Sequence, residues 1–357
     1  MKIVVAMSGG VDSSVAAALL AEQGHDVIGL SMQLYDVSRQ SGEHQFGSCC
    51  SIEDLYDARR VAARINIPHY ILNFEKQFNH HVVSNFVGEY ASGRTPLPCA
   101  HCNSDLKFTE LLERAHGFGA DAVATGHYAR VEKTARGTYQ LKRGVDASKD
   151  QSYFLFSLTQ DQLARAIFPV GDRPKDAVRE YAHQRQLPVA DKPDSQEICF
   201  IPDHDYASFL TKHSPELAQA GDVVDESGQV LAQHGGIHRF TIGQRKGLGL
   251  PTSPTGAPMY VLALKPVEQQ VVVGPKSSLE QTTLTASGVN WIEGVPAGPV
   301  RAHVQIRHRH PAAAATVRSV GDGRVEVIFD APQIAITPGQ AAVFYDGDSV
   351  LGGGWIE

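Results

Sequence analysis

The sequence predicts an α/β protein with an amino-terminal doubly wound parallel sheet, a small central β-rich domain and a carboxy-terminal β-barrel. Short apolar strands alternate with helical stretches in the first part, a pattern typical of parallel sheets. Beyond residue 205, short β-branched runs lie between Gly, Pro and Asp turns, as in small β domains and barrels. We expect domains at residues 1–205, 206–272 and 273–357.

The first part contains the clearest individual elements. Helical periodicity predicts a helix over Asp12–Gln23, and Gly24 stands where a left-handed carboxy-terminal cap is expected. Ser51 with Asp54 resembles a capping box that opens a helix through Ile65. The strands expected here are Lys2–Met7, Val27–Met32, His69–Phe74 and Asp121–Thr125.

The later strands are shorter and separated by turn residues. Their spacing favours one small β domain and one barrel rather than a further parallel sheet. The clearest runs are Gly221–Val224, Tyr260–Leu264, Val271–Val273, Arg324–Phe329 and Ala341–Tyr345.

Bulk composition excludes several classes of protein. The 357 residues are 42% hydrophobic and 20% charged, as in ordinary globular proteins. No apolar run is long enough for a bilayer, and the first residues lead into a strand rather than a signal peptide, so we expect a cytoplasmic protein without membrane contact. The net charge of −7 argues against binding nucleic acid through bulk charge, but local basic patches remain compatible with RNA.

The most specific local signal is the loop Ser8-Gly9-Gly10-Val11-Asp12-Ser13-Ser14, between the first strand and the first helix. Two glycines let the backbone approach an anion, and a helix amino terminus offers unpaired N–H groups. Asp12 could help to hold Mg²⁺. No Lys follows the glycines, so this is not a Walker A loop, and γ-phosphate transfer is not implied. The sequence predicts phosphate binding here.

The five cysteines do not suggest a disulfide framework. Cys102 follows a Pro-rich segment and precedes a helix expected near Ser104, and a helix start favours the nucleophilic thiolate. Cys199 lies between apolar neighbours, which alone is more typical of a small buried side chain. Cys49-Cys50 lies in a polar loop, and we expect it to be incidental.

The glycine loop resembles the pyrophosphate-binding loop of the ATP α-hydrolase superfamily, and the whole chain resembles the tRNA-specific 2-thiouridylases. The resemblance implies an adenine nucleotide α-hydrolase-like first domain that uses ATP with Mg²⁺. The further motifs that carry the resemblance are Gly93–Pro96, Cys102-Asn103, Lys107-Phe108, Ala124–Tyr128, Lys149–Leu155, Ile198–Ile201, Gly243–Gly249, Thr337–Gln340 and Leu351–Gly354.

The resemblance also implies a mechanism. Cys199 receives sulfur as a persulfide from a sulfur-relay protein or cysteine desulfurase, and ATP adenylates the C2 oxygen of the wobble uridine. The persulfide attacks C2, and Cys102 then attacks Cys199, which releases 2-thiouridine and leaves a Cys102–Cys199 disulfide. The partners would be a tRNA anticodon loop and the sulfur donor, and we expect a monomer.

The resemblance assigns further residues. The nucleotide would contact Ala6, Met7, Ser8, Gly9, Gly10, Val11, Asp12, Ser13, Met32 and Gly126. The target base and tRNA would contact Leu97, Pro98, Cys99, His127, Lys149, Asp150, Gln151, Arg307, His308 and Gln340. Without the resemblance, Met32 and Gly126 would be interpreted as a core methionine and a turn glycine.

Cys99 departs from the family pattern, which has an acid/base Asp at this position. The thiol could take that role, or Cys99, Cys102 and Cys199 could hold an iron–sulfur cluster with one open iron. No second Cys pair with suitable spacing accompanies Cys99 and Cys102, so a zinc site is not predicted.

Two other functions remain open at this point. The first is another adenylating ligase or amidotransferase-type enzyme with the same loop, which would leave the cysteines unexplained. The second is a non-catalytic RNA-binding protein with a vestigial nucleotide loop.

Overall fold

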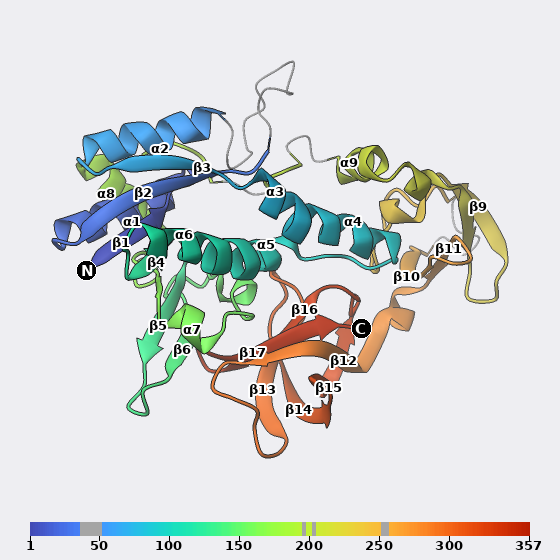
Figure 1. Ribbon diagram of the computed structural model, residues 1–357. Helices are drawn as coiled ribbons and strands as arrows, with labels where there is room; N and C mark the ends of the chain where they lie inside the picture. The colour runs from blue at the N-terminus through green and yellow to red at the C-terminus, as the bar shows by residue number, and fades with distance from the viewer. Residues whose placement is uncertain (36–51, 195–197, 202–204, 251–256) are drawn as a thin grey trace.

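The computed structural model describes residues 1–35, 52–194, 198–201, 205–250 and 257–357 (Figure 1). The amino-terminal sheet has the strand order β3-β2-β1-β4-β7, and all of its pairings are parallel. Its strands are β1 (Lys2–Ala6), β2 (Asp26–Gln33), β3 (His69–Asn73), β4 (Ala122–Ala124) and β7 (Ala166–Ile167). The predicted parallel sheet is confirmed.

Helices cover both faces of this sheet because successive side chains of each strand point to opposite sides. Ile3 and Val5 of β1 belong to the core formed with α1, α2 and α8, whereas Val4 belongs to the core that contains Phe86 and Leu111. The fold is therefore doubly wound, as predicted. The helical segments up to residue 184 are α1 (Val11–Glu22), α2 (Ile52–Arg64), α3 (Glu75–Phe78), η2 (Asn79–Val83), α4 (Ser84–Ala91), α5 (Pro98–His101), η3 (Cys102–Glu110), α6 (Leu111–Gly117), η4 (Ser152–Phe154), α7 (Gln160–Leu163) and α8 (Lys175–Gln184).

The helix expected near Ser104 begins earlier, so that prediction was wrong. Pro98 is the first residue of α5, where its fixed φ suits a helix and its missing N–H costs nothing. The chain continues helically through the π-helical η3 into α6. Cys99 therefore lies in the first turn, and Cys102 lies one turn further along. The predicted cap at Gly24 has φ +80°, as expected, while Ser51 of the predicted capping box lies outside the described residues.

The central domain is a four-stranded sheet of order β10-β11-β8-β9 with its own small core, which includes Phe240 and Val271. β11 crosses residue 272, where the sequence placed a boundary. The elements are α9 (Tyr206–His213), η5 (Pro215–Ala218), β8 (Gly221–Val224), β9 (Val230–His234), η6 (Ile237–Arg239), β10 (Tyr260–Lys265), β11 (Gln270–Gly274) and the connecting η7 (Lys276–Leu279).

The carboxy-terminal domain is a closed six-stranded antiparallel barrel, because β12 pairs with both β15 and β17. A hairpin of β5 (Ala129–Lys133) and β6 (Tyr139–Arg143) extends it: Lys142 and Leu141 pair with Ser349 and Val350 of β17. The barrel strands are β12 (Glu280–Trp291), β13 (Val300–Gln305), β14 (Ala313–Gly321), β15 (Arg324–Ile334), β16 (Ala341–Asp346) and β17 (Ser349–Ile356).

The barrel and the first domain share one core. Val343 and Tyr345 of β16 belong to the same buried cluster as Leu30 of β2 and Leu106 of η3. Figure 1 shows α5 and α6 between the parallel sheet and the barrel. Within the described residues, no helix has the length and apolar character needed to cross a membrane.

Candidate active site

The glycine loop lies where an open α/β sheet usually binds its ligand. From β1 the chain passes to β2 on one side of the strand, and β4 lies on the other side, so the strand order reverses between β1 and β4. Crevices at such points, beyond the carboxyl ends of the strands, are common ligand sites. Met7–Gly10 follows β1 and Gly126 follows β4. A Cβ at Gly126 would lie 2.5 Å from the Ser13 backbone nitrogen. The segment after β4 therefore packs directly against the start of α1.

The loop backbone is tightly constrained. Gly9 has φ +75°, and a Cβ there would lie 2.2 Å from the backbone oxygen of Asp54, so only glycine fits. The Ser8 N–H donates to Ser13 Oγ (3.2 Å), and the Ser14 hydroxyl donates to the Gly10 carbonyl (2.7 Å). Gly10 is the N-cap of α1 and supplies no side-chain cap. No side chain of the N-cap pairs with the first-turn N–H groups of α1, which is compatible with the predicted anion site.

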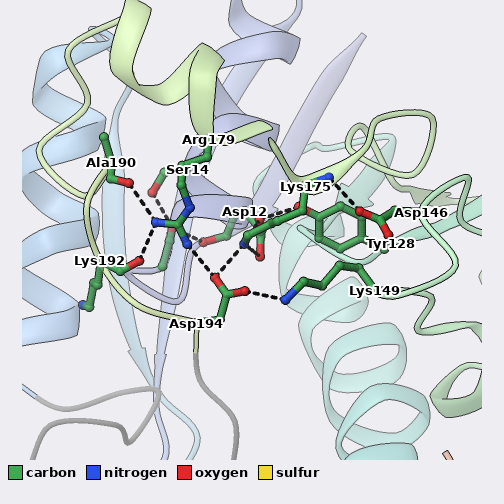
Figure 2. A network of polar contacts seen from close by, with 12 residues as sticks. Asp12, Ser14, Tyr128, Asp146, Lys149, Lys175, Arg179, Ala190, Lys192 and Asp194 are labelled. Carbon is green, nitrogen blue, oxygen red and sulfur yellow. Dashed lines mark hydrogen bonds and ion pairs between the residues drawn. The ribbon is translucent and has the colours of Figure 1, made fainter. Parts of the chain in front are cut away.

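A buried lysine that the sequence did not single out lies beside this loop (Figure 2). The Lys175 ammonium donates to both carboxylate oxygens of Asp12, at 2.7 and 2.8 Å, and its residue is only 7% exposed. Tyr128 also donates its hydroxyl to Asp12 (2.7 Å). Burial and the neighbouring Asp12 carboxylate raise the pKa of Tyr128, so this phenol keeps its proton. Both Asp12 oxygens thus accept hydrogen bonds, and the Mg²⁺ contact expected of Asp12 stays a prediction.

Asp194 connects three cations around the same crevice. It accepts from Lys149 (2.7 Å) and Arg179 (3.0 Å), and it pairs with Lys175 (2.8 Å) (Figure 2). Burial favours the neutral carboxyl, but the hydrogen bonds from Lys149 and Lys175 outweigh it and lower the pKa of Asp194. The ionised Asp194 therefore fixes Lys149, a predicted tRNA contact, beside the nucleotide loop.

Lys192 holds the other side of the loop. Its ammonium donates to the Gly9 carbonyl (3.1 Å), to Asp57 (2.6 Å) and to Asp54. Burial lowers the pKa of Lys192, but these two carboxylates raise it more, so the ammonium persists. Lys175 and Lys192 were missed because only folding brings α8 and the following segment to the loop. Asp12 and Lys175 are 163 positions apart.

No metal-binding arrangement occurs among the residues that the structure describes. No group of three or more His, Cys, Asp or Glu side chains there could hold an ion. Cys99, Cys102 and Cys199 do not form such a group among the described residues, so the structure adds no support to the iron–sulfur hypothesis. Cys49 and Cys50 lie outside the described residues.

The two cysteines of the predicted sulfur-handling pair lie against one hydrophobic core. Cys102 and Cys199 are both half-buried, and both pack against the core that the first domain shares with the barrel. Next to Cys199, Phe200 packs edge-on against Phe78 (5.5 Å) and Phe86 (5.2 Å). These rings anchor the turn next to Cys199 in the shared core.

The residues before Cys102 differ in exposure. Leu97 and Pro98 are buried, whereas Cys99 is exposed in the first turn of α5. Gln340 donates to the carbonyls of Thr95 (3.0 Å) and Pro96 (3.1 Å), so it contacts this segment from the barrel. Of the predicted target-base residues, Cys99 is the one whose side chain is accessible.

Several residues predicted to contact tRNA make hydrogen bonds within the protein. The Asp150 carboxylate is buried and accepts from Arg143 (2.7 Å) and the Gly144 N–H (3.1 Å). Gln151 accepts from the Tyr128 N–H (3.0 Å). His127 is buried against Thr125, and burial lowers its pKa well below the usual range, so it is neutral.

The predicted barrel contacts divide in the same way. Arg307 donates to the carbonyls of Ala335 (2.8 Å) and Ile242 (3.2 Å), which ties the barrel to the central domain. His308 is exposed at the same strand end and lies 4.4 Å from the Phe154 ring centroid. Of this pair, His308 is exposed and Arg307 is half-buried.

Comparison with known proteins places the chain in a family. Family models match residues 1–203 (tRNA methyl transferase HUP domain), 207–275 (tRNA methyl transferase PRC-barrel domain) and 281–356 (aminomethyltransferase β-barrel domain). A tRNA-specific 2-thiouridylase MnmA of Geotalea uraniireducens is 50% identical over 100% of this chain and 95% of its own. That of Solibacter usitatus is 53% identical over 99% of each chain. The chain belongs to the tRNA-specific 2-thiouridylase family.

Membership in this family confirms the resemblance drawn from the sequence, and the three matched domains correspond to the parallel sheet, the central sheet and the barrel. Among solved structures, a 4-thiouridine synthetase–RNA complex with bound ATP overlaps 60% of this chain and 50% of its own, at 17% identity and a TM-score of 0.35. At this TM-score nothing about the present chain is inferred from it.

Proposed function

We propose that this chain is an ATP-dependent tRNA-uridine 2-sulfurtransferase that thiolates the wobble uridine. One observation carries the proposal: the same fold holds a glycine loop suited to an anion and two half-buried cysteines that pack on a common core. Thiolation requires both, the loop for ATP and the cysteines for sulfur. The full-length identity to curated 2-thiouridylases supports the same conclusion.

ATP is the first substrate. Its phosphates would meet first-turn N–H groups at the start of α1, beside the buried Lys175. Ala6, Met7, Met32 and Gly126 lie at the strand ends around this loop and would contact the nucleotide. Adenylation converts the C2 oxygen of uridine into a leaving group and releases pyrophosphate. ATP would be used with Mg²⁺, to which no separate step is assigned here.

The sulfur step balances with the two cysteines alone. A donor, either a sulfur-relay protein or a cysteine desulfurase, leaves a persulfide on Cys199. The outer sulfur attacks C2 and expels AMP, which links the base to Cys199 through a disulfide. The Cys102 thiolate then attacks Cys199 Sγ, so 2-thiouridine leaves and a Cys102–Cys199 disulfide forms. The two cysteines supply the two electrons that reduce the transferred sulfur.

The tRNA would contact the side chains that remain accessible around this site, namely Cys99, Lys149 and His308. We propose that the buried His127 and Asp150 act beneath that surface through packing contacts, and that the half-buried Gln151 and Arg307 lie at its edge. The proposed domains are 1–205, 206–272 and 273–357, with the second boundary moved to the end of β11 at Gly274. The working unit is a cytoplasmic monomer.

A single-turnover assay tests the proposal. Protein, ATP, Mg²⁺, a persulfide donor and unmodified tRNA are combined, and AMP and 2-thiouridine are counted by chromatography. Wild type should form both one for one, and Cys199→Ser should form no 2-thiouridine. AMP formation that requires a carboxylate and ammonia instead would identify an adenylating ligase and overturn the thiolation proposal.

A further inference from the structure

The segment that leads into Cys99 and Cys102 rests on one turn of the barrel. We call residues 93–98 the cysteine lead and residues 337–340 the barrel turn. Gln340 donates from its side-chain amide to the Thr95 and Pro96 carbonyls, at 3.0 and 3.1 Å. In the opposite direction, the Thr95 N–H donates to the Pro338 carbonyl (2.9 Å). The barrel turn therefore pairs with both backbone carbonyls and a backbone N–H of the cysteine lead.

The contact between the two segments is too close for a side chain. Gly339 has φ +88°, and a Cβ there would lie 2.9 Å from the Thr95 oxygen and 3.0 Å from the Thr95 nitrogen. The left-handed backbone conformation and the lack of room for a Cβ both require glycine at position 339. The lead is therefore held against backbone, which is stiffer than a side-chain contact.

The barrel turn is itself fixed within the barrel. The Gly339 N–H donates to the Ile356 carbonyl (2.9 Å), and the Ile356 N–H donates to the Gln340 carbonyl (2.8 Å). Arg307 donates to Thr337 Oγ1 (2.5 Å), at the start of the turn. The turn thus transfers the rigidity of a closed barrel to the lead.

Gln340 is the side chain best suited to hold this lead. Pro96 and Pro98 carry no N–H, so the lead cannot form an ordinary strand ladder and depends on partners for its carbonyls. A primary amide has two N–H donors, and in Gln340 these serve two successive carbonyls. Only its Oε1 remains for a nucleic acid.

We propose that Gln340 is a positioning residue, which fixes the start of α5 so that Cys99 and Cys102 face the reacting base. This inference rests on the proposed function, and it adds a task to the tRNA contact that the sequence predicted for Gln340. Reaction rates depend steeply on such placement, since a displacement of about 1 Å can cost about 100-fold.

The test compares Gln340→Ala and Gln340→Glu with a matched control. Glu keeps the volume and the acceptor but loses both donors. Gln333, on the same barrel, also donates its amide to two backbone carbonyls, those of Ala331 (2.9 Å) and Pro332 (3.2 Å), but holds no active-site segment. Single-turnover thiolation at saturating tRNA, the tRNA Kd and hydrogen exchange of residues 93–102 are measured in each.

Both Gln340 variants should thiolate about 10- to 100-fold more slowly at saturating tRNA, with a smaller change in the tRNA Kd and faster exchange in the cysteine lead. Gln333→Ala should match wild type in all three. A weaker tRNA Kd with a normal saturated rate and unchanged exchange would overturn the inference. If wild type itself makes no 2-thiouridine, the proposed function fails, and the exchange comparison still decides whether Gln340 holds the lead.

Discussion

At the scale of single residues, two glycines with nearly the same φ predict opposite consequences. Gly9 (φ +75°) lies against the Asp54 backbone, whereas a Cβ at Gly24 (φ +80°) would meet nothing within 4 Å. Gly24→Ala should cost only the left-handed strain, about 1–2 kcal/mol, and keep activity. Gly9→Ala should also displace the nucleotide loop and abolish AMP formation. Urea unfolding and the AMP assay check both, and an active Gly9→Ala protein would contradict this account of the loop.

Lys175 offers a second residue-scale prediction. Lys175→Met removes the ammonium between Asp12 and Asp194 while keeping most of the side-chain volume. AMP formation should fall about 100- to 1,000-fold, the usual effect of losing one aligned charge-stabilising donor. Lys212→Met, at an exposed position of α9, is the control. A normal rate of AMP formation at saturating ATP in Lys175→Met would remove Lys175 from the phosphate site.

At the scale of elements, the sequence predicted what depends on local pattern. The strands around β1, the helix that ends before Gly24 and the glycine loop follow from periodicity and turn chemistry, and all were found. The start of α5 at Pro98 was missed, because the Pro-rich segment was interpreted as a loop although Pro favours the first helical turn. The pairing of β6 with β17 could not be predicted, since it joins residues about 200 positions apart.

The same holds within the site. The sequence identified the glycine loop and both cysteines, which carry their own chemical signature. It did not identify Lys175, Arg179 or Asp194, whose roles arise only where separate segments meet. It also predicted a tRNA contact for Asp150, whose buried carboxylate accepts hydrogen bonds from Arg143 and the Gly144 N–H.

The shared core makes an element-scale prediction about the first domain. Leu141 of β6 and Phe156 pack with residues of the barrel, so residues 1–205 alone would expose them. We expect this fragment to bind a hydrophobic dye and to lack both near-ultraviolet circular dichroism and a cooperative thermal transition. The full chain is the reference, and a sharp, native-like transition in the fragment would contradict a shared core.

At the scale of the whole molecule, buried histidines predict how stability varies with pH. Among the described residues, burial lowers the pKa of five histidines: His69, His127, His234, His238 and His308. Below the unfolded pKa of about 6.5, these histidines bind protons in the unfolded chain but stay neutral in the folded chain. The free energy of unfolding therefore falls as pH decreases. Above that value both states are neutral and the effect disappears.

Urea unfolding at pH 7.5, 6.5 and 5.5 measures this dependence. The free energy of unfolding should drop below pH 6.5, by at most about 1.4 kcal/mol per pH unit for each histidine that stays neutral. The lowered pKa values of Asp57 and Asp194 act only near and below about pH 4, outside this range. His127→Gln should flatten the slope, and stability that rises toward pH 5.5 would contradict the assignment.

The central claim is that Cys199 carries the sulfur and Cys102 releases the product, and trapping the intermediate tests it most directly. Cys102→Ser is given ATP, persulfide donor and labelled tRNA, then run on denaturing gels with and without reductant. We predict a tRNA–protein adduct that reductant removes, absent from Cys199→Ser and absent from wild type once turnover is complete. Release of 2-thiouridine by Cys102→Ser at the wild-type rate, with no adduct, would contradict the account.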